Sequence, residues 1–188
     1  MSLFAYSYIK VKKNVILGMQ NRIVLLLGGN LGDREMILRR CISLLTENVG
    51  TMAAISGLYI SEPWGFQEDV PDFWNCVVVL DSDLNAKEVL GSTQRIEKEL
   101  GRTNKGGEVY QSRIIDIDLL FFNDEIIRED DLEVPHKGIP HRRFVLEPLN
   151  ELLSDYRHPV LQKRITRLLN ECTDRSTVYC EKMLTDEL

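Results

Sequence analysis

The order of extended and helical segments in this sequence predicts an α+β sandwich. Segments of β-branched, aliphatic and aromatic residues, typical of buried strands, alternate with two segments whose apolar residues recur at helical spacing. Taken in order they give β-α-β-β-α-β, followed by a hairpin and two further helices. The chain of 188 residues is long enough to bury the core of one such domain. The predicted fold class is therefore a ferredoxin-like sandwich with an added hairpin and C-terminal helices.

The first strand is predicted over residues 22–27, where an uninterrupted apolar run indicates full burial. The glycine-rich residues 28–33 follow it. A turn of this composition after a strand is typical of phosphate loops, but the Gly-Lys-Ser/Thr ending is absent. We therefore expect a tight turn in which Asp33 caps the next helix. The apolar stripe of that helix comprises Ile37, Leu38, Cys41, Leu44 and Leu45.

The next two strands are expected over residues 51–60 and 76–80. The loops between them concentrate aromatic side chains beside the polar residues Ser61 and Asn75. The aromatic residues are Trp64, Phe66, Phe73 and Trp74. Each could be an ordinary core residue. As a group they could instead form a slot for a flat heterocycle, and the residues alone leave both interpretations open.

A capping box predicts the start of the second helix, because Asn85 is followed three residues later by Glu88. The apolar stripe of this helix comprises Val89, Leu90, Ile96 and Leu100. Gln94 and Glu97 lie together on a neighbouring face. The polar, glycine-rich residues 102–109 that follow have the composition of a mobile loop.

Two carboxylates interrupt the apolar strand predicted over residues 114–122. Side chains alternate along a strand, so Asp116 and Asp118 would share one face, about 6.6 Å apart. The other face would comprise Ile115, Ile117, Leu119 and Phe121. A solvated strand face is the plainer interpretation, but an oxygen-only pair also suits Mg²⁺. Arg102 and Arg113 bracket the preceding loop, an arrangement suited to closing over a polyphosphate.

Beyond the acidic strand, the turn at residues 123–124 predicts a hairpin into residues 125–127. A second cationic cluster then lies around two prolines. It comprises His136, Lys137, His141, Arg142 and Arg143. A short helix is expected over residues 145–153, with Pro148 limiting its start, and an amphipathic helix over residues 160–172.

The predicted domain covers residues 22–172. Residues 1–21 form an N-terminal extension without a regular pattern, and we hypothesise that Met19 is the natural start. Residues 173–188 are expected to be a polar tail that frays. A net charge of −6 and a pI near 5.2 argue against a general nucleic-acid binder. The four scattered cysteines predict reduced thiols, as in the cytoplasm, and no apolar run reaches the roughly 18 residues of a membrane span.

Several short motifs occur together and in order. They are Gly-Asn-Leu-Gly-Asp at 29–33, Pro-Asp-Phe-Trp-Asn at 71–75, Gln-Arg-Ile-Glu at 94–97, Gly-Arg at 101–102, Ser-Arg at 112–113 with Asp-Ile-Asp at 116–118, and Val-Pro-His at 134–136 followed by Arg142 and Phe144. Each motif is weak alone, but their order and spacing are specific. Over roughly residues 23–169 the sequence resembles the 6-hydroxymethyl-7,8-dihydropterin pyrophosphokinase family of folate biosynthesis.

The resemblance implies that the pterin hydroxymethyl oxygen attacks the β-phosphorus of ATP, giving the pterin diphosphate and AMP. The catalytic residues would be Arg102, Arg113, Asp116 and Asp118, with two Mg²⁺ ions held by Asp116 and Asp118. The ATP-binding residues would be Gln94, Glu97, Arg102, Tyr110, Arg113, His136 and Arg142. The pterin-binding residues would be Ser61, Trp64, Phe73, Asn75 and Phe144. The expected partners are these two small molecules, without nucleic acid or membrane, for a monomer or weak dimer.

The sequence departs from the family pattern in the loop before the acidic strand. Many members carry further arginines there, and a tryptophan before a Gly-Pro-Arg sequence. The corresponding residues here are Asn104, Val109, Tyr110, Gln111 and Ser112. Tyr110 is expected to stack where the tryptophan would. The alternative functions are an Mg²⁺-dependent nucleotidyltransferase, which would release pyrophosphate, and a non-catalytic ligand-binding domain of the same architecture.

Overall fold

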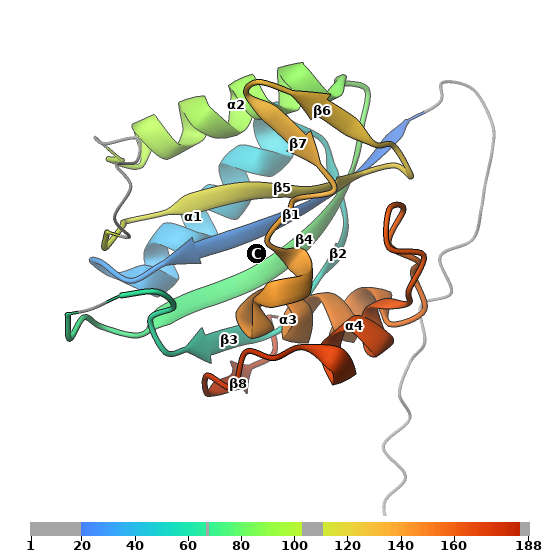
Figure 1. Cartoon of the computed structure of the whole chain (residues 1–188). Helices are drawn as coiled ribbons and strands as arrows, with labels where there is room; N and C mark the ends of the chain where they lie inside the picture. Colours follow the sequence, from blue (N-terminus) through green and yellow to red (C-terminus); the bar gives the residue numbers. More distant parts are fainter. Residues whose placement is uncertain (1–19, 67, 103–110, 185–188) are drawn as a thin grey trace, which may run out of the picture.

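A computed structural model describes residues 20–66, 68–102 and 111–184. Its elements, in chain order, are β1 (Asn21–Gly29), α1 (Arg34–Asn48), β2 (Thr51–Ile55), β3 (Leu58–Ser61), β4 (Phe73–Ser82), α2 (Ala86–Glu99), β5 (Asp116–Phe122), β6 (Ile127–Glu129), β7 (Leu132–Val134), the 3-10 helix η1 (Ile139–His141), α3 (Arg143–Leu153), α4 (Ile165–Glu171) and β8 (Val178–Lys182). Figure 1 shows one continuous sheet with helices packed against it.

The sheet confirms the predicted sandwich. Its strand order is β5-β1-β4-β3-β8, and β2 also pairs with β4. Each of these pairs is antiparallel. β1 lies between β4 and β5, and its apolar residues are buried on both faces, as the uninterrupted apolar run predicts. The central strands and the helices α1 and α2 follow the expected β-α-β-β-α-β order, except that two strands, β2 and β3, stand where one was expected.

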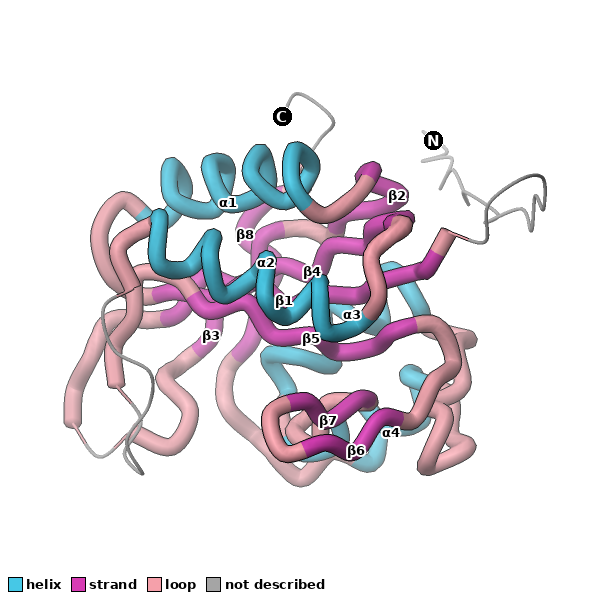
Figure 2. The backbone as a smooth tube through the Cα atoms, turned by 90° about the horizontal axis from the view of Figure 1, so that it is seen from above, coloured by secondary structure: helices cyan, strands magenta, loops and turns pink. Residues whose placement is uncertain are grey.

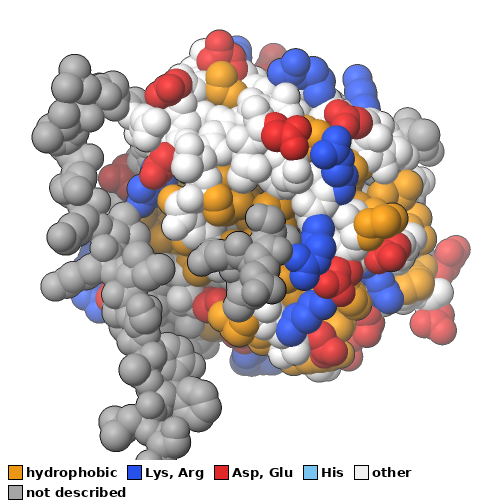
Figure 3. Space-filling model, turned by 180° about the vertical axis from the view of Figure 1, so that it is seen from behind, with side chains coloured by type: hydrophobic (Ala, Val, Ile, Leu, Met, Phe, Trp, Pro, Cys, Tyr) orange, Lys and Arg blue, Asp and Glu red, His pale blue; other side chains and the backbone are white. Residues whose placement is uncertain are grey.

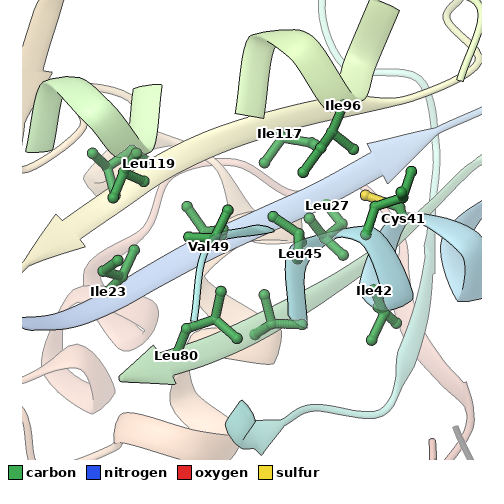
Figure 4. Close-up of a cluster of buried hydrophobic side chains, with 14 of the residues drawn as sticks. Ile23, Leu27, Cys41, Ile42, Leu45, Val49, Leu80, Ile96, Ile117 and Leu119 are labelled. Carbon is green, nitrogen blue, oxygen red and sulfur yellow. The ribbon is translucent and has the colours of Figure 1, made fainter. Parts of the chain in front are cut away.

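Helices cover both faces of the sheet. Figure 2 shows α1 and α2 on one side and α3 and α4 on the other. The first core joins α1 and α2 to the sheet, and side chains such as Leu27, Leu45 and Ile117 converge there (Figure 4). The second core joins α3 and α4 to the opposite face, around Leu26, Phe121 and Leu149.

The predicted starts of α1 and α2 are confirmed. The Asp33 carboxylate accepts a hydrogen bond from the Met36 N–H at 3.1 Å. Asn85 and Glu88 form a complete capping box, in which Asn85 Oδ1 accepts from the Glu88 N–H and Glu88 Oε2 accepts from the Asn85 N–H.

On the face seen in Figure 3, basic and acidic side chains of the described residues are interspersed.

Two strand predictions need correction. The expected strand over residues 51–60 is two strands, because Ser56 and Gly57 leave the ladder. The Ser56 hydroxyl accepts from the Val77 N–H at 2.9 Å, and the Gly57 N–H donates to the Glu151 carboxylate at 3.0 Å. The predicted hairpin also forms elsewhere. The chain turns at Asn123, but β6 pairs with β7 rather than returning along β5.

The simple alternation expected for β5 fails at its C-terminal end. The register between β1 and β5 shifts between Val24 and Leu25, which leaves Leu120 as an extra residue. Leu120 and Phe121 consequently both join the core beside α3, and Phe121 does not share a face with Leu119. Asp116 and Asp118 precede the irregularity and keep the predicted common face.

The C-terminal part of the chain is more ordered than the sequence indicated. α3 begins at Arg143 and includes Pro148 within the helix, although we expected Pro148 to limit its start. α4 is shorter than predicted, because Val160 and Leu161 lie outside it and are exposed. Residues 178–182, expected to fray, form the edge strand β8 against β3. The supposed tail is therefore part of the sheet as far as it is described.

The remaining expectations concern the ends, the thiols and the membrane. Residues 1–19, which include the extension and Met19, lie outside the described residues. The cysteines are unpaired, with Cys41, Cys76 and Cys172 buried and Cys180 exposed. Within residues 20–66, 68–102 and 111–184, no helix combines the length and the hydropathy that crossing a bilayer requires.

Candidate active site

A cavity of about 230 Å³ opens at the end of the sheet where β1 ends and β4 and β5 begin. It lies on the face that carries α3. Its lining residues are Leu26, Gly28, Ser61, Glu62, Trp64, Phe66, Phe73, Asn75, Gln111, Arg113, Asp116, Asp118, His136, Arg142 and Phe144. One wall is aromatic and combines residues of the loop after β3, of β4 and of α3, and the other carries carboxylates from β5.

Strand register explains why distant residues share this cavity. Gly28 of β1 pairs with Asn75 of β4 on one side and with Asp116 of β5 on the other. Directly paired residues project to the same face of a sheet. A side chain at Gly28 would fill the space between them, since its Cβ would lie 2.9 Å from Asn75 Oδ1. The glycine therefore keeps the floor of the cavity open.

The aromatic wall combines stacking surfaces with a fixed polar edge. The rings of Phe66 and Phe73 have centroids 5.7 Å apart. Asn75 and Ser61 are both buried, and the Asn75 amide donates to the Ser61 hydroxyl at 3.0 Å. Such a wall can accept a flat ring and satisfy polar atoms along the edge of that ring.

Arg142 connects the aromatic wall to the charged wall. Its guanidinium carbon lies 4.9 Å from the centroid of the Trp64 ring and 5.9 Å from that of Phe144. Both distances are in the range of cation–π attraction. Gly138 lies close to the same guanidinium, because a Cβ there would be 2.9 Å from Arg142 Nη1 and 2.9 Å from His136 Cε1.

On the charged wall, one carboxylate holds two arginines. Asp116 forms ion pairs with Arg102 through one oxygen and with Arg113 through the other. Arg102 also pairs with Glu97, a buried residue of α2. The Glu97 carboxylate additionally accepts a hydrogen bond from the Ile117 N–H at 2.9 Å. These contacts hold both arginines beside the cavity before any ligand binds.

Asp118 and His136 have shifted proton affinities. Burial raises the pKa of Asp118 to about 7, and the negative charge of Asp116 adds to the shift. Burial lowers the pKa of His136 to about 4, and the positive charges of Arg142 and Lys137 act in the same direction. At pH 7 the imidazole of His136 is therefore neutral.

The backbone before Arg113 is fastened by a residue to which the sequence gave no functional role. Asn30 is buried, its side-chain oxygen accepts from the Arg113 N–H at 2.8 Å, and its amide donates to the Ser112 hydroxyl at 2.9 Å. The same amide donates to the Pro71 carbonyl at 3.2 Å. Asn30 thus ties the turn after β1 to the segments that lead into β4 and β5. The only sequence signal was its place in the Gly-Asn-Leu-Gly-Asp motif.

Comparison with known proteins identifies the family. Residues 24–154 match the family described as 7,8-dihydro-6-hydroxymethylpterin-pyrophosphokinase. The chain belongs to this family. The 2-amino-4-hydroxy-6-hydroxymethyldihydropteridine pyrophosphokinase of Porphyromonas gingivalis is 42% identical over 139 residues, which cover 73% of this chain and 93% of that protein. The Bacillus subtilis enzyme of the same name is 41% identical over 135 residues, which cover 71% of this chain and 79% of that protein.

Longer relatives contain the same region. The mitochondrial folate synthesis bifunctional protein of Pisum sativum is 37% identical over 131 residues, covering 70% of this chain and 25% of that protein. The crystal structure of wild-type Plasmodium falciparum HPPK-DHPS with STZ-DHP superposes with a TM-score of 0.68 at 20% identity. That match covers 81% of this chain, which spans 43% of the Plasmodium chain, and at this identity it supports the fold alone.

The residues predicted from the pyrophosphokinase resemblance fall into four groups. Those that line the cavity are Ser61, Trp64, Phe73, Asn75, Phe144, Arg113, Asp116, Asp118, His136 and Arg142. Arg102 and Glu97 stand behind this wall, joined to it through Asp116 and Ile117. Gln94 lies on α2 and is not among the lining residues. Tyr110 lies outside the described residues.

Sequence reasoning also missed some of the lining. Leu26, Glu62 and Gln111 contribute to the cavity although no motif singled them out. Leu26 could have been found from register, because it pairs with Asp118 across β1 and β5. Glu62 follows Ser61 directly at the end of β3, but the sequence carries no signal for the direction of its side chain.

The charged wall of this pyrophosphokinase fits a metal ion only in part. Within the described residues, no group of three or more His, Cys, Asp or Glu side chains is arranged to hold an ion. The two carboxylates of Asp116 and Asp118 suit Mg²⁺, which is usually held by one or two carboxylates, with water and substrate phosphates completing its coordination. The donor set therefore fits an ion that arrives with a phosphate ligand.

Proposed function

We propose that this chain transfers pyrophosphate from ATP to 6-hydroxymethyl-7,8-dihydropterin, giving the pterin diphosphate and AMP for folate biosynthesis. The names of the relatives from Porphyromonas gingivalis and Bacillus subtilis support this function. The observation that carries it is the single cavity in which an aromatic wall faces a paired-carboxylate wall. One wall suits a flat heterocycle and the other a polyphosphate, and both substrates are needed for the reaction.

In this proposal the pterin ring occupies the aromatic wall. Trp64, Phe73 and Phe144 would stack against its faces. Asn75 and Ser61 would bind the polar atoms along its edge. Both are buried and already hydrogen-bonded to each other, so they are held in place before binding. This arrangement lowers the entropy cost of ordering the site.

The phosphates of ATP would lie along the charged wall. Arg102, Arg113, His136 and Arg142 would meet them, with Gln94 and Glu97 on the nucleotide side. Arg102 has a specific reason to take this role: its buried Nε has no hydrogen-bond partner among the residues described in the structure. An anionic oxygen would satisfy that donor.

The reaction joins the pterin hydroxymethyl oxygen to the β-phosphorus and breaks the bond from that phosphorus to the oxygen on the α-phosphate, so that AMP leaves. Two Mg²⁺ ions, held by Asp116 and Asp118 with phosphate oxygens, would neutralise the charge of the reacting phosphates. Arg113 and Arg102 would be positioned by Asp116 to stabilise that charge, which develops mainly on the transferred group.

The test is to incubate the protein with ATP, Mg²⁺ and 6-hydroxymethyl-7,8-dihydropterin and to separate the products by chromatography. We expect AMP and pterin diphosphate in equal amounts, only when the pterin is present, and none after EDTA is added. A nucleotidyltransferase would instead release pyrophosphate and attach the adenylyl group to the acceptor. Binding of both substrates without any product would support the non-catalytic alternative.

We further infer that the protein acts in the cytoplasm as a monomer or a weak dimer. The buried and unpaired state of Cys41, Cys76 and Cys172 supports a reducing compartment. Sedimentation of the purified protein at micromolar concentration would test the oligomeric state.

A further inference from the structure

The segment from Cys172 to the end of β8 contacts the aromatic wall of the cavity at two places that are far apart in the sequence. We call residues 172–182 the C-terminal strap. Its start is fixed because Cys172 is buried in the core beside α3 and α4. Its end is fixed by pairing of β8 with β3 and by an ion pair of Lys182 with Glu35 of α1 at 2.6 Å. The strap lies outside residues 24–154, which match the family.

The strap caps α3, the helix that carries Phe144 of the aromatic wall. The residue before α3, Arg142, provides no side-chain cap. Instead, Asp174 Oδ2 accepts the Arg143 N–H at 2.8 Å. The other oxygen of Asp174 accepts the Ser176 N–H at 2.9 Å, which fixes the carboxylate. A carboxylate at this position satisfies a free N–H group and interacts favourably with the helix dipole.

The strap also holds the part of the aromatic wall that follows β3. The Glu62 N–H donates to the Thr177 carbonyl at 3.2 Å. In return, the Thr177 N–H and hydroxyl donate to the two oxygens of the Glu62 carboxylate at 3.0 and 2.9 Å. The next residue, Val178, pairs with Ser61 in the sheet. The loop that carries Trp64 therefore begins at Glu62, which makes three hydrogen bonds to Thr177 of the strap.

These contacts connect two parts of the aromatic wall that are remote from each other in the sequence. Asp174 acts on the start of α3, between Arg142 and Phe144, while Thr177 acts on the residue next to Ser61. Neither Asp174 nor Thr177 lines the cavity. We propose that the C-terminal strap sets the spacing between these two parts of the aromatic wall, so that Asp174 and Thr177 are positioning residues for pterin affinity. This inference rests on the proposed function.

The proposal separates the two substrates. The strap makes its cavity-side contacts at Glu62 and Arg143, which flank the aromatic wall. Arg102, Arg113 and the carboxylates of β5 are positioned by α2 and by Asn30 instead. Loosening the strap should therefore weaken pterin binding more than ATP binding, which it reaches only through Arg142, the residue before Arg143.

The experiment compares Asp174→Ala with the wild-type chain and with Glu171→Ala. Glu171 is a matched control, because it is a nearby carboxylate with two partners, Lys163 and Arg167, but it contacts neither wall. We expect Asp174→Ala to raise the KM for the pterin about fivefold, which corresponds to about 1 kcal/mol. The KM for ATP should change less than twofold, and Glu171→Ala should change neither.

A second readout does not depend on turnover. Amide hydrogen exchange at residues 58–62 should be faster in Asp174→Ala and in Thr177→Val than in the wild type or Glu171→Ala. Thr177→Val removes only the hydroxyl contact, so its effect should be the smaller one. If Asp174→Ala folds poorly, Asp174→Asn, which keeps an acceptor oxygen, should restore folding and most of the pterin affinity.

The outcomes are distinct. Unchanged exchange and unchanged pterin KM in Asp174→Ala would overturn the strap proposal. Equal loss of affinity for pterin and ATP would also overturn it, since that result indicates a general loss of structure. Absence of AMP from the wild-type chain would instead overturn the proposed function. In that case the exchange measurement would still decide whether the strap orders residues 58–62.

Discussion

The two walls of the cavity are built in different ways. The charged wall is on the regular strand β5, and its carboxylate Asp116 is held by two arginines. The aromatic wall combines residues of a loop, of the ends of β3 and β4 and of α3, and it is held by contacts from the C-terminal strap. A charge network beside a strand is fixed by local geometry, whereas the spacing of an aromatic slot depends on segments far apart in the chain.

This difference suggests a division of labour in the proposed reaction. Electrostatic stabilisation requires charges that do not reorganise during the reaction, and a sheet supplies such rigidity. Recognition of a heterocycle requires a slot of a given width, which loops can adjust. Changes to the charged wall should therefore lower the rate most, and changes to the aromatic wall should mainly lower affinity.

The largest effect is expected for Asp118→Asn. It removes one of the two carboxylates proposed to hold Mg²⁺, and turnover should fall at least about 1000-fold. The fold should persist, because burial already makes the charged form of Asp118 unfavourable. AMP formation and a thermal melt would measure the two effects. Near-normal turnover would refute the metal role of this residue.

Arg113→Ala should have the next largest effect. Arg113 pairs with Asp116 and lines the cavity, so its loss should lower kcat about 100-fold through weaker stabilisation of the transferred phosphates. The KM for the pterin should change little. Steady-state kinetics with each substrate varied in turn would show the split, and a change confined to KM for ATP would contradict a transition-state role.

Trp64→Ala tests the aromatic wall in the same assay. Loss of one stacking surface should raise the KM for the pterin about tenfold, consistent with about 1.4 kcal/mol. kcat at saturating pterin should stay within about threefold of the wild type. A large drop in kcat with an unchanged KM would show that the two walls do not differ in the way proposed.

Gly138→Ala tests the point where the walls meet. The backbone at Gly138 has a φ of −75°, which any residue adopts, so the added methyl acts only through its close approach to His136 and Arg142. We expect activity to fall about threefold to tenfold without loss of stability. Gly91→Ala is the control, because nothing lies within 4 Å of a Cβ there. It should stabilise α2 by roughly 0.5–1 kcal/mol and leave activity unchanged.

The smallest effect is expected for His158→Asn, because His158 lies outside both walls. His158 is buried, and its Nδ1 accepts from the Val160 and Leu161 N–H groups. Burial lowers the pKa of His158, so the unfolded state binds more protons than the folded state once the pH falls below about 6.5. The free energy of unfolding should therefore decrease as the pH falls below that value. Urea unfolding at pH 7.5 and 5.5 should show a smaller drop for the asparagine variant, which keeps an acceptor but does not titrate.

Features governed by short-range rules were predictable from the sequence. The caps at Asp33 and Asn85 depend on residues within three positions, and the common face of Asp116 and Asp118 depends on strand alternation alone. The bulge at Leu120 depends on pairing with β1, which the sequence of β5 does not reveal. The hairpin prediction failed for the same reason.

Most residues of the site could be predicted from the sequence, but the contacts that hold them together could not. Motif order brought together ten of the lining residues, yet nothing in the sequence links Glu62 with Thr177, which are 115 positions apart. Likewise, the capping of α3 by Asp174 could not be predicted, because a helix is normally capped by the residue that precedes it. Contacts of this kind become visible only when the sheet order is known.

The position of β1 at the centre of the sheet has a consequence for how the protein folds. β1 pairs with β4 and β5, whose partner residues are far along the chain, as Gly28 with Asp116 illustrates. Such non-local pairing raises contact order and slows folding into the millisecond to second range. During synthesis, β1 is made well before β5, one of its two neighbours in the sheet, and β8 is the last strand of the sheet to be made. The last residue that lines the cavity is Phe144, so a chain that stops before α3 should lack a complete site.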